Sequence, residues 1–450
     1  MNDHSVTTLD VDQGELENLV RRVVDEACRR GATQAEAAVS SEVGLSVSVR
    51  LGDVETLEYH SDRGLGVTVY FGKSKGSASS ADLSDEALVQ TVDKAVSIAR
   101  YTAEDPCGGL ADAEMMAGEL LDLQLSHPWP LAPQQAIELA LECEQAARDV
   151  DERITNSEGA SINSHQGIRV YANSHGFVGG YPSTSHSISC AVVASDENGM
   201  ERDYWYDSGR SHADLLAPAK VGRIAGERTV RRLGARKTAT QSAPVLFPAE
   251  LARGLVGHYI AGIGGTAQYR KATFLLDIAG QQVFPEFMDV SERPHLLRAA
   301  GSAPMDNEGV ATRDRELVTA GIAQGYVLNS YSARKLGLQT TGNAGGVHNL
   351  LVKPSIPGGL KELVQKMGTG LLVGELMGQG VNGVTGDYSR GAAGFWIENG
   401  EISHPVHEIT IAGNLQNMFR NIVAIGSDID TRGRVRSGSI LIEQMTIAGN

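Results

Sequence analysis

The sequence has few cysteines and no long apolar run, and both absences limit what the protein can be. Its four cysteines are scattered through 450 residues without a C-x-x-C pair. Such spacing argues against a disulfide framework and is typical of buried thiols in a reducing compartment. No stretch reaches the ~18 consecutive apolar residues that a membrane span requires. We therefore expect a cytoplasmic protein that does not cross or bind a membrane.

Positive charge is also scarce. The chain has 39 Lys and Arg residues against 55 Asp and Glu residues, a formal net charge of −16. Duplex binding relies on many contacts between Lys or Arg and phosphate, so most of this surface would repel DNA. A short basic cluster at Arg228–Arg232, with Arg236 and Lys237, alternates with apolar positions at helical spacing. It predicts a solvated helix face, and no nucleic-acid partner is expected.

The common catalytic motifs are missing as well. The sequence contains no Walker A motif, no G-x-G-x-x-G after a strand, no G-x-S-x-G elbow and no H-E-x-x-H. His407 and Glu408 begin like the zinc motif, but position 411 is isoleucine. Both residues lie in an alternating pattern and are predicted to be a surface pair on a strand.

What the sequence does contain is a repeated pattern of helix, strands and helix. Apolar residues recur at helical spacing from Leu16 to Arg30, and Ser84 is a plausible cap for a helix that runs to about Tyr101. Strict alternation predicts separate short strands in two runs. The first run comprises Gly44–Arg50, Val54–Tyr59 and Gly64–Phe71. The second comprises Ile154–Ser157, Ser161–Ser164, Gly167–Asn173, Gly176–Tyr181 and Ser183–Ser195.

These patterns predict an α+β fold in three parts. Pro-rich and polar links suggest an N-terminal α+β domain at 14–125, a central α+β domain at 126–240 and a β-rich C-terminal domain at 241–450. In the first two, helices are expected on mostly antiparallel sheets. The third is expected to contain a twisted or barrel-like sheet, with a helix beginning near Pro248 set against it.

Several blocks of the C-terminal part carry a specific resemblance to a known family. They are Pro248–Gly264, Tyr269–Asp277, Tyr331–Gly337, Gly342–Gly346, Glu375–Gly380, Thr385–Trp396 and Glu408–Leu415. Together they make the chain resemble the TldD/PmbA peptidase family from about residue 14 to the end. Within it, the chain looks like the PmbA (TldE) branch and is similar to gammaproteobacterial members.

This resemblance implies a degenerate metal site on the helix after Pro248. The TldD branch carries H-E-x-x-x-H there, completed by a cysteine near the C-terminus. With Gly257 and His258 aligned, the first ligand falls on Arg253 and the general base on Gly254, and only His258 is retained. No cysteine lies beyond Cys190.

The departure bears on mechanism because a catalytic zinc needs about three protein ligands and a carboxylate base. Arg253 would also place a permanent positive charge beside the cation. We therefore expect no catalytic residue and no metal or other cofactor in this chain, with zinc on a TldD-type partner. His258 is expected to be packed or hydrogen-bonded.

Another group of polar residues lies in a glycine-rich turn. Asp387, Tyr388, Ser389 and Arg390 are good turn residues, and they could instead line a channel shared with a partner. A Ser–His–Asp site assembled from distant parts of the chain stays open at this point, since such partners come from anywhere in a sequence.

The resemblance implies a subunit of a TldD–TldE zinc metallopeptidase complex that degrades or trims peptides, as in antitoxin turnover and peptide antibiotic maturation. This chain would be its non-catalytic member, with a TldD-type subunit and unfolded peptides as partners and a homodimer possible when it is alone. Two alternatives are a self-sufficient peptide hydrolase with an unrecognised site and a regulatory binding protein linked to DNA gyrase.

Overall fold

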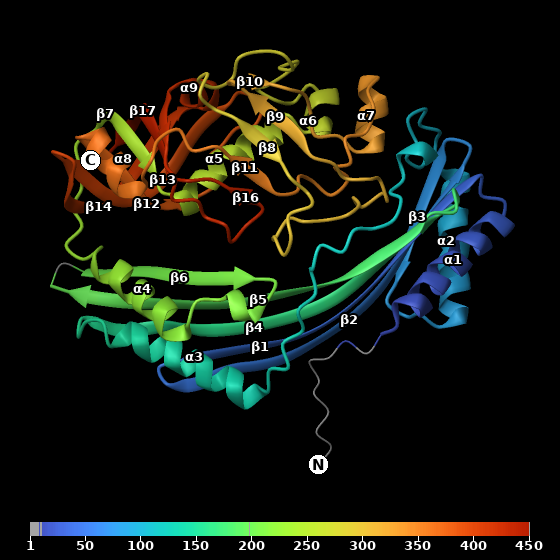
Figure 1. The fold of residues 1–450 in the computed structure, drawn as a ribbon, viewed down its shortest axis with the longest axis horizontal. Helices are drawn as coiled ribbons and strands as arrows, with labels where there is room; N and C mark the ends of the chain where they lie inside the picture. Colours follow the sequence, from blue (N-terminus) through green and yellow to red (C-terminus); the bar gives the residue numbers. More distant parts are fainter. Residues whose placement is uncertain (1–8, 10, 198, 450) are drawn as a thin grey trace.

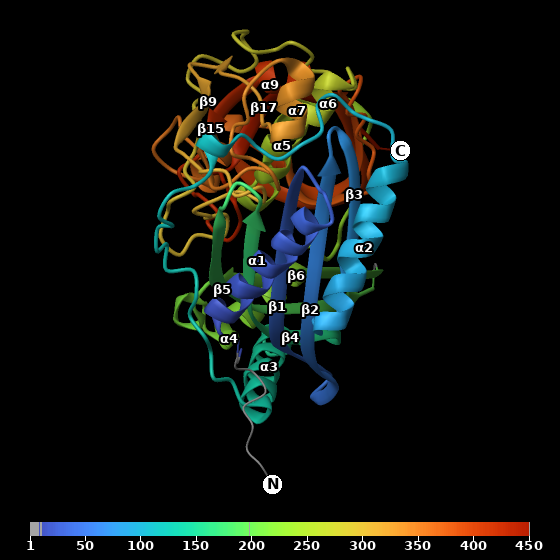
Figure 2. The same ribbon diagram turned by 90° about the vertical axis from the view of Figure 1, so that its right-hand side faces the viewer.

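Two bodies make up the molecule: a long, strongly curved sheet with helices on its convex side, and a C-terminal body over its concave side (Figures 1 and 2). The computed structural model describes residues 9, 11–197 and 199–449. Its mixed helices and sheets confirm the predicted α+β class.

The curved sheet is fully antiparallel and has the strand order β3-β2-β1-β4-β5-β6. Its strands are β1 (Gln34–Arg50), β2 (Asp53–Phe71), β3 (Ser74–Ser80), β4 (Ile154–Asn173), β5 (Val178–Asp196) and β6 (Gly199–Gly209). The pairing of β1 with β4 joins strands from the N-terminal and central segments into one continuous sheet. The limits 14–125, 126–240 and 241–450 stay a prediction.

Several strands predicted as separate are single strands in the structure. Val54–Tyr59 and Gly64–Phe71 both belong to β2, and the strand that follows, β3, was not predicted from the sequence. The three short strands predicted between 154 and 173 are likewise one strand, β4, and the two that followed them merge in β5. Gly159 lies within β4 and does not end it. Its φ is 103°, and it occupies a bulge where the β4–β5 register shifts.

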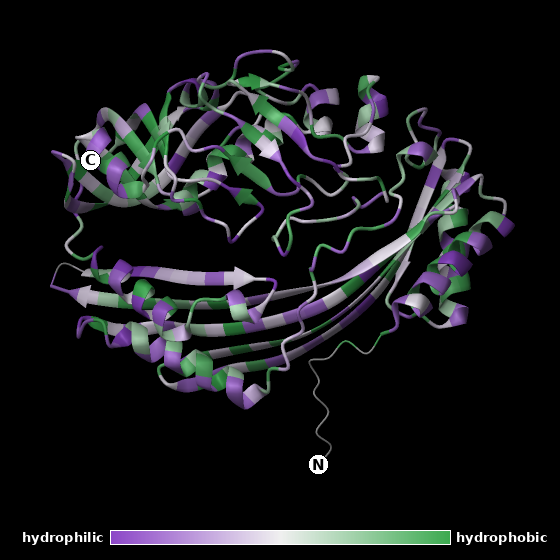
Figure 3. Ribbon diagram, in the orientation of Figure 1, coloured by the Kyte–Doolittle hydropathy of each residue, from purple (hydrophilic) through white to green (hydrophobic). Residues whose placement is uncertain are grey.

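Strict alternation along these strands separates a helix-covered face from a polar one. On β1 the odd-numbered residues Ala35, Val39, Leu45 and Val49 are buried against the helices, and the even-numbered ones face the concave side. Figure 3 shows the resulting change of hydropathy along the long strands. The period of two therefore creates both the core and the inner surface.

Four helices cover the convex face in two pairs. They are α1 (Gln13–Arg29) and α2 (Asp85–Tyr101), which share one core with β1 and β2, and α3 (Pro133–Arg148) and α4 (Pro218–Val230), which share another with β4 and β5. Ser84 caps α2 by accepting a hydrogen bond from the Ala87 N–H, which confirms the predicted start.

The connection between α2 and α3 contains the short 3₁₀ turn η1 (Ala113–Met115), contacts the C-terminal body at Met116 and Leu123, and then runs beside the first half of β5 (Figure 2). Two polar side chains hold it there. Thr184 accepts a hydrogen bond from the His127 N–H at 2.9 Å, and His186 Nε2 lies 3.0 Å from the His127 carbonyl. A second 3₁₀ turn, η2 (His212–Asp214), follows β6.

The C-terminal body contains a closed barrel, as the sequence predicted. Strands pair in the order β14-β13-β12-β7-β17, and β14 also pairs with β17, which closes the ring. The strands are β7 (Gln241–Phe247), β12 (Gly370–Met377), β13 (Asp387–Glu398), β14 (Glu401–Asn414) and β17 (Ile440–Ala448), with β15 (Ile422–Ile425) added on β17. Only the contact between β7 and β12 is parallel among these.

A smaller sheet lies beside the barrel in the order β10-β9-β8-β11-β16. Its strands are β8 (Val290–Glu292), β9 (Arg315–Thr319), β10 (Ile322–Ala323), β11 (Leu350–Val352) and β16 (Val435–Arg436). The helices of this body are α5 (Ala249–Gly262), α6 (Gly265–Tyr269), α7 (Ser330–Leu336), α8 (Leu360–Met367) and α9 (Leu415–Arg420). Within the described residues, none of the helices has the length and apolar character needed to traverse a bilayer.

Candidate functional site

Helix α5 is where the resemblance places the metal motif, and its two faces differ sharply. Pro248 precedes the helix, which buries Ala252, Leu255 and Tyr259 in the core of the C-terminal body. The opposite face carries Gly254 and Gly257, and a Cβ atom at either position would meet nothing within 4 Å. Open space therefore lies beside this part of the helix.

The side chain of Arg253 forms a contact between the two bodies. Its Nη1 donates a hydrogen bond of 2.9 Å to the Tyr206 hydroxyl on β6. Its charge also helps to keep the pKa of Asp430 below its usual range, although burial opposes this and the hydrogen bonds from Arg432 contribute more. At the position of the expected first ligand, the structure has a cation held by the curved sheet.

His258 lies half-buried and packs on an aromatic ring. The imidazole meets Tyr388 edge-to-face, with ring centroids 6.0 Å apart and an angle of 80° between the planes. Burial, followed by the nearby charge of Arg390, lowers the pKa of His258. The lowered pKa favours the neutral form of the ring, which packs against Tyr388.

The four residues of the glycine-rich turn begin strand β13, and its alternation divides them. Tyr388 is buried and Arg390 half-buried, whereas Asp387 and Ser389 are exposed. Burial raises the pKa of Tyr388 to about 12, with the Arg390 guanidinium opposing that rise. The structure thus brings Tyr388 and Arg390 to His258 but directs the other two residues away.

Asp387 has a local role on the exposed face. Its carboxylate accepts hydrogen bonds from the Thr385 hydroxyl at 2.6 Å and from the Asn414 amide at 3.3 Å, and these two bonds lower its pKa. All three residues belong to the turn between β12 and β13 or to the end of β14. This arrangement stabilises the turn.

The donor set around α5 does not fit a zinc ion. Of the three motif positions, Arg253 brings a positive charge, Gly254 brings no side chain, and only His258 could donate a lone pair, while Glu250 of the same helix is paired with Arg228. Across residues 9, 11–197 and 199–449, no group of three or more His, Cys, Asp or Glu side chains is arranged to hold a metal. A catalytic zinc requires about three ligands and an open position. That the chain carries no metal stays a prediction.

A network of charges that the sequence did not reveal joins α4 and β6 to the C-terminal body. Arg228 contacts Asp203 at 3.4 Å and Glu250 at 2.9 Å. Arg232 contacts Glu201, Asp203 and Glu375, with the Nη1–Oε2 distance to Glu375 at 2.7 Å. The prediction of a solvated face is therefore wrong for Arg228 and Arg232, whose side chains are only 23% and 13% exposed.

One feature of the sequence could have predicted this network: two acidic residues alternate along β6. Glu201 and Asp203 lie two positions apart on one edge strand, and α4 packs against that strand. By contrast, His407 and Glu408 are surface residues of β14, as predicted. His407 lies 3.4 Å from Glu201, and Glu408 forms an exposed ion pair with Lys237.

The concave face of the curved sheet is lined with hydroxyl groups. Strand pairing places them on this face in register, and two of them, Ser48 and Thr56, hydrogen-bond each other at 2.6 Å. The set comprises Ser40, Ser46, Ser48, Thr56, Thr68, Ser161, Ser183, Ser185, Ser187 and Ser189. Such a surface offers hydrogen bonds without apolar pockets that would select particular side chains.

Comparison with known proteins agrees with this architecture. Three family models match in succession: the PmbA/TldA metallopeptidase domain 1 at residues 35–99, the central domain at 126–233 and the C-terminal domain at 240–449. The chain is similar to Metalloprotease PmbA of Escherichia coli O157:H7, with 53% identity over 92% of each chain. It is also similar to the Metalloprotease PmbA homolog of Haemophilus influenzae, with 49% identity over 100% of this chain and 99% of that one.

A solved structure shares the whole fold. The crystal structure of a putative modulator of DNA gyrase from Bacteroides thetaiotaomicron superposes with a TM-score of 0.92 at 28% sequence identity. The match covers 98% of this chain and 100% of that one. The curved sheet and the C-terminal body therefore occur in the same arrangement in both molecules.

Proposed function

The chain belongs to the PmbA branch of the PmbA/TldD metallopeptidase family, and from this premise we propose that it is the non-catalytic subunit of a peptidase complex whose zinc lies on a TldD-type partner. The observation that supports the proposal is what the residues at the three motif positions of α5 contact. Arg253 is engaged with Tyr206, Gly254 has no side chain, and His258 packs on Tyr388. The carboxylate of this helix, Glu250, lies two turns before His258 and is paired with Arg228 at 2.9 Å.

In this proposal the subunit handles peptides and leaves their hydrolysis to its partner. The concave face supplies exposed and half-buried hydroxyl groups in rows, which suits an extended peptide whose backbone groups need hydrogen bonds. Covering the partner's cleft with such a surface would admit unfolded segments of varied sequence and exclude folded proteins. The complex would work in the cytoplasm, on substrates such as antitoxins and peptide antibiotic precursors.

The deciding experiment compares four samples: this chain alone, a TldD-type subunit alone, their mixture, and the mixture with a zinc chelator. Zinc content is measured on each purified subunit, and hydrolysis is followed with a fluorogenic unstructured peptide. We expect substoichiometric zinc in this chain and hydrolysis only in the untreated mixture. Near-stoichiometric zinc in this chain, or robust hydrolysis by it alone, would overturn the proposal.

A self-sufficient hydrolase is the second candidate, and the names of the two relatives favour it, since both are called metalloproteases. The sample of this chain alone decides between the two. Binding to gyrase at physiological salt would be needed for a regulatory role, and the net charge of −16 opposes direct contact with DNA.

A further inference from the structure

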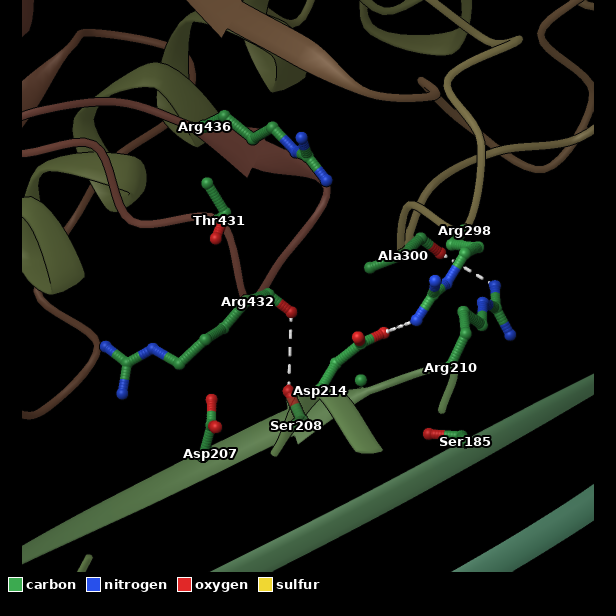
Figure 4. Close-up of a pocket in the computed structure, with 11 residues that line it drawn as sticks. Ser185, Asp207, Ser208, Arg210, Asp214, Arg298, Ala300, Thr431, Arg432 and Arg436 are labelled. Atoms are coloured by element: carbon green, nitrogen blue, oxygen red, sulfur yellow. Dashed lines mark hydrogen bonds and ion pairs between the residues drawn. The ribbon is translucent and has the colours of Figure 1, made fainter. Parts of the chain in front are cut away.

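A cavity of about 430 Å³ lies where the end of β6 meets the C-terminal body. Ser185 and Ser208 form its floor on the concave side of the sheet, and the segments around Arg298 and Arg436 approach from above (Figure 4). Its size is within the usual range for small-ligand pockets. It thus forms a pocket at one end of the hydroxyl-lined face.

Four arginines line this cavity, and two of them are already neutralised. Arg298 forms an ion pair with Asp214 across the pocket. Arg432 directs its guanidinium away to Asp430, with both N–O contacts at 2.9 Å, and contributes its carbonyl to the lining. The remaining positive charge belongs to Arg210 and Arg436.

The side chain of Arg436 has no hydrogen-bond or ion-pair partner among the residues that the structure describes. No carboxylate or other acceptor contacts its guanidinium, and its Nε is buried. Arg210 donates to the carbonyls of Thr184 and Ala300, both at 2.9 Å, but meets no carboxylate, and its Nε is also buried without an acceptor. Burial lowers the pKa of both side chains. Desolvated cations of this kind are stabilised by an anion supplied from outside.

The chemistry of the cavity favours a carboxylate over a phosphate. Guanidinium groups match the planar fork of a carboxylate with two parallel hydrogen bonds. Asp207 and Asp214 also line the pocket, and their charges oppose a dianion more strongly than a monoanion. Ser185 continues into the row of serines on β5, so an extended chain on that face would reach the cavity with one end.

We propose that this cavity is a carboxylate-binding subsite, in which Arg436 and Arg210 hold a carboxylate of a peptide lying along the concave face. The inference rests on the proposed peptide-handling function and names the anchor by which such a peptide would be held. The group bound is either the terminal carboxylate of the peptide or that of an acidic side chain, and the arms of the test distinguish these sources.

The test measures binding to the full-length chain by fluorescence anisotropy. Three peptides of glycine and serine with an N-terminal dye are used: one with a free C-terminal carboxylate, one amidated, and one amidated with a single internal aspartate. We expect at least tenfold tighter binding of one or both acid-bearing peptides than of the amidated peptide without an acid. Acetate at high concentration should displace them.

Variants assign the binding to the cavity. Arg436→Gln should weaken binding of the acid-bearing peptide at least tenfold, and Arg436→Lys should weaken it less, since charge remains but the fork is lost. Because the side chain of Arg436 makes no hydrogen bond within the described chain, both variants should fold, and Arg210→Lys, which should also weaken binding, provides a second test. Arg21→Gln, an exposed position on α1 with the same loss of charge, should bind as the parent does.

Two results would overturn the inference. One is equal binding of all three peptides, and the other is displacement by inorganic phosphate at far lower concentration than by acetate. Failure of the proposed function would look different. Peptide binding that depends on Arg436, with no hydrolysis after mixing with the partner, would refute the complex and retain the subsite.

Discussion

The guanidinium of Arg432 lies over the indole of Trp205, 4.3 Å from the ring centroid, and so ties the C-terminal body to β6 of the curved sheet. Arg228 from α4 lies over the same ring at 5.0 Å, and Arg432 also donates to the Tyr206 carbonyl at 2.8 Å. A cation–π contact stabilises a structure by about 2 kcal/mol when the cation is desolvated, which is more than at an exposed site. This contact acts together with the Arg253–Tyr206 hydrogen bond and the Arg232–Glu375 ion pair in joining the two bodies.

Replacing Arg432 by alanine should therefore destabilise the protein. The change would remove the contact with Trp205 and leave the carboxylate of Asp430, 5% exposed, without its cation. Removing one partner of a buried ion pair costs about 3 kcal/mol. Urea unfolding followed by tryptophan fluorescence measures this loss. The exposed Arg21→Ala serves as the control, and equal midpoints for both variants would contradict the prediction.

The buried carboxylate of Glu292 should make stability depend on acidity. Burial by itself would raise its pKa, but the hydrogen bond from His348 and the charge of Arg315 outweigh burial and bring the pKa to about 2. A carboxyl with a depressed pKa stabilises the fold above its unfolded value, near 4.5, and that contribution is lost as pH falls toward 2.

We expect the stability difference between the parent and Glu292→Gln to be largest at neutral pH and to shrink between pH 4.5 and 2. Asn343 also donates to this carboxylate at 2.8 Å, so the variant should be less stable at pH 7. Thermal midpoints measured across the pH range give the answer. A difference that is constant with pH would show that the charge of Glu292 does not contribute.

Restoring two residues of the metal motif should not create an enzyme. In Arg253→His with Gly254→Glu, the helix would regain a ligand and a base, and the space beside Gly254 can accept the new side chain. A third ligand would still be missing, so zinc would bind weakly. Hydrolysis of an unstructured peptide by this variant alone should equal the blank, and measurable turnover would contradict us. Because the change also removes the hydrogen bond from Arg253 to Tyr206, circular dichroism is used to check that the variant folds.

The chain alone should self-associate through exposed apolar residues. Leu57 and Tyr59 on β2 are 40% and 44% exposed, and Leu51 and Val54 at the adjacent hairpin are 46% and 47% exposed. Apolar patches of this kind mark interfaces. Leu57→Glu should shift sedimentation toward the monomer, whereas Ile98→Glu on α2 should not. A parent chain that stays monomeric at all concentrations would count against this interface.

Local patterns determined the elements of this protein but not their lengths. The helix stripe ending at Arg30 and the cap at Ser84 identified α1 and α2, because capping and periodicity act over a few residues. The sequence predicts more and shorter strands than the curved sheet contains, because glycine and serine are common in turns. In a sheet that bends around a second body, these residues sit within strands, at bulges and on the polar face.

Residue identities alone determined that α5 retains one residue, His258, of the H-E-x-x-x-H motif, because a motif is defined by side chains and their spacing on a helix. Only the tertiary structure decided that Arg253 donates a hydrogen bond to Tyr206. It also decided that Tyr388 and Arg390 point into the protein, whereas Asp387 and Ser389 are exposed. The same holds for the cavity around Arg436, whose walls come from residues 185–214, 298–300 and 431–436. Such contacts join segments far apart in the chain. Local sequence patterns extend over a few residues and therefore do not predict which distant charged side chains will lie close together.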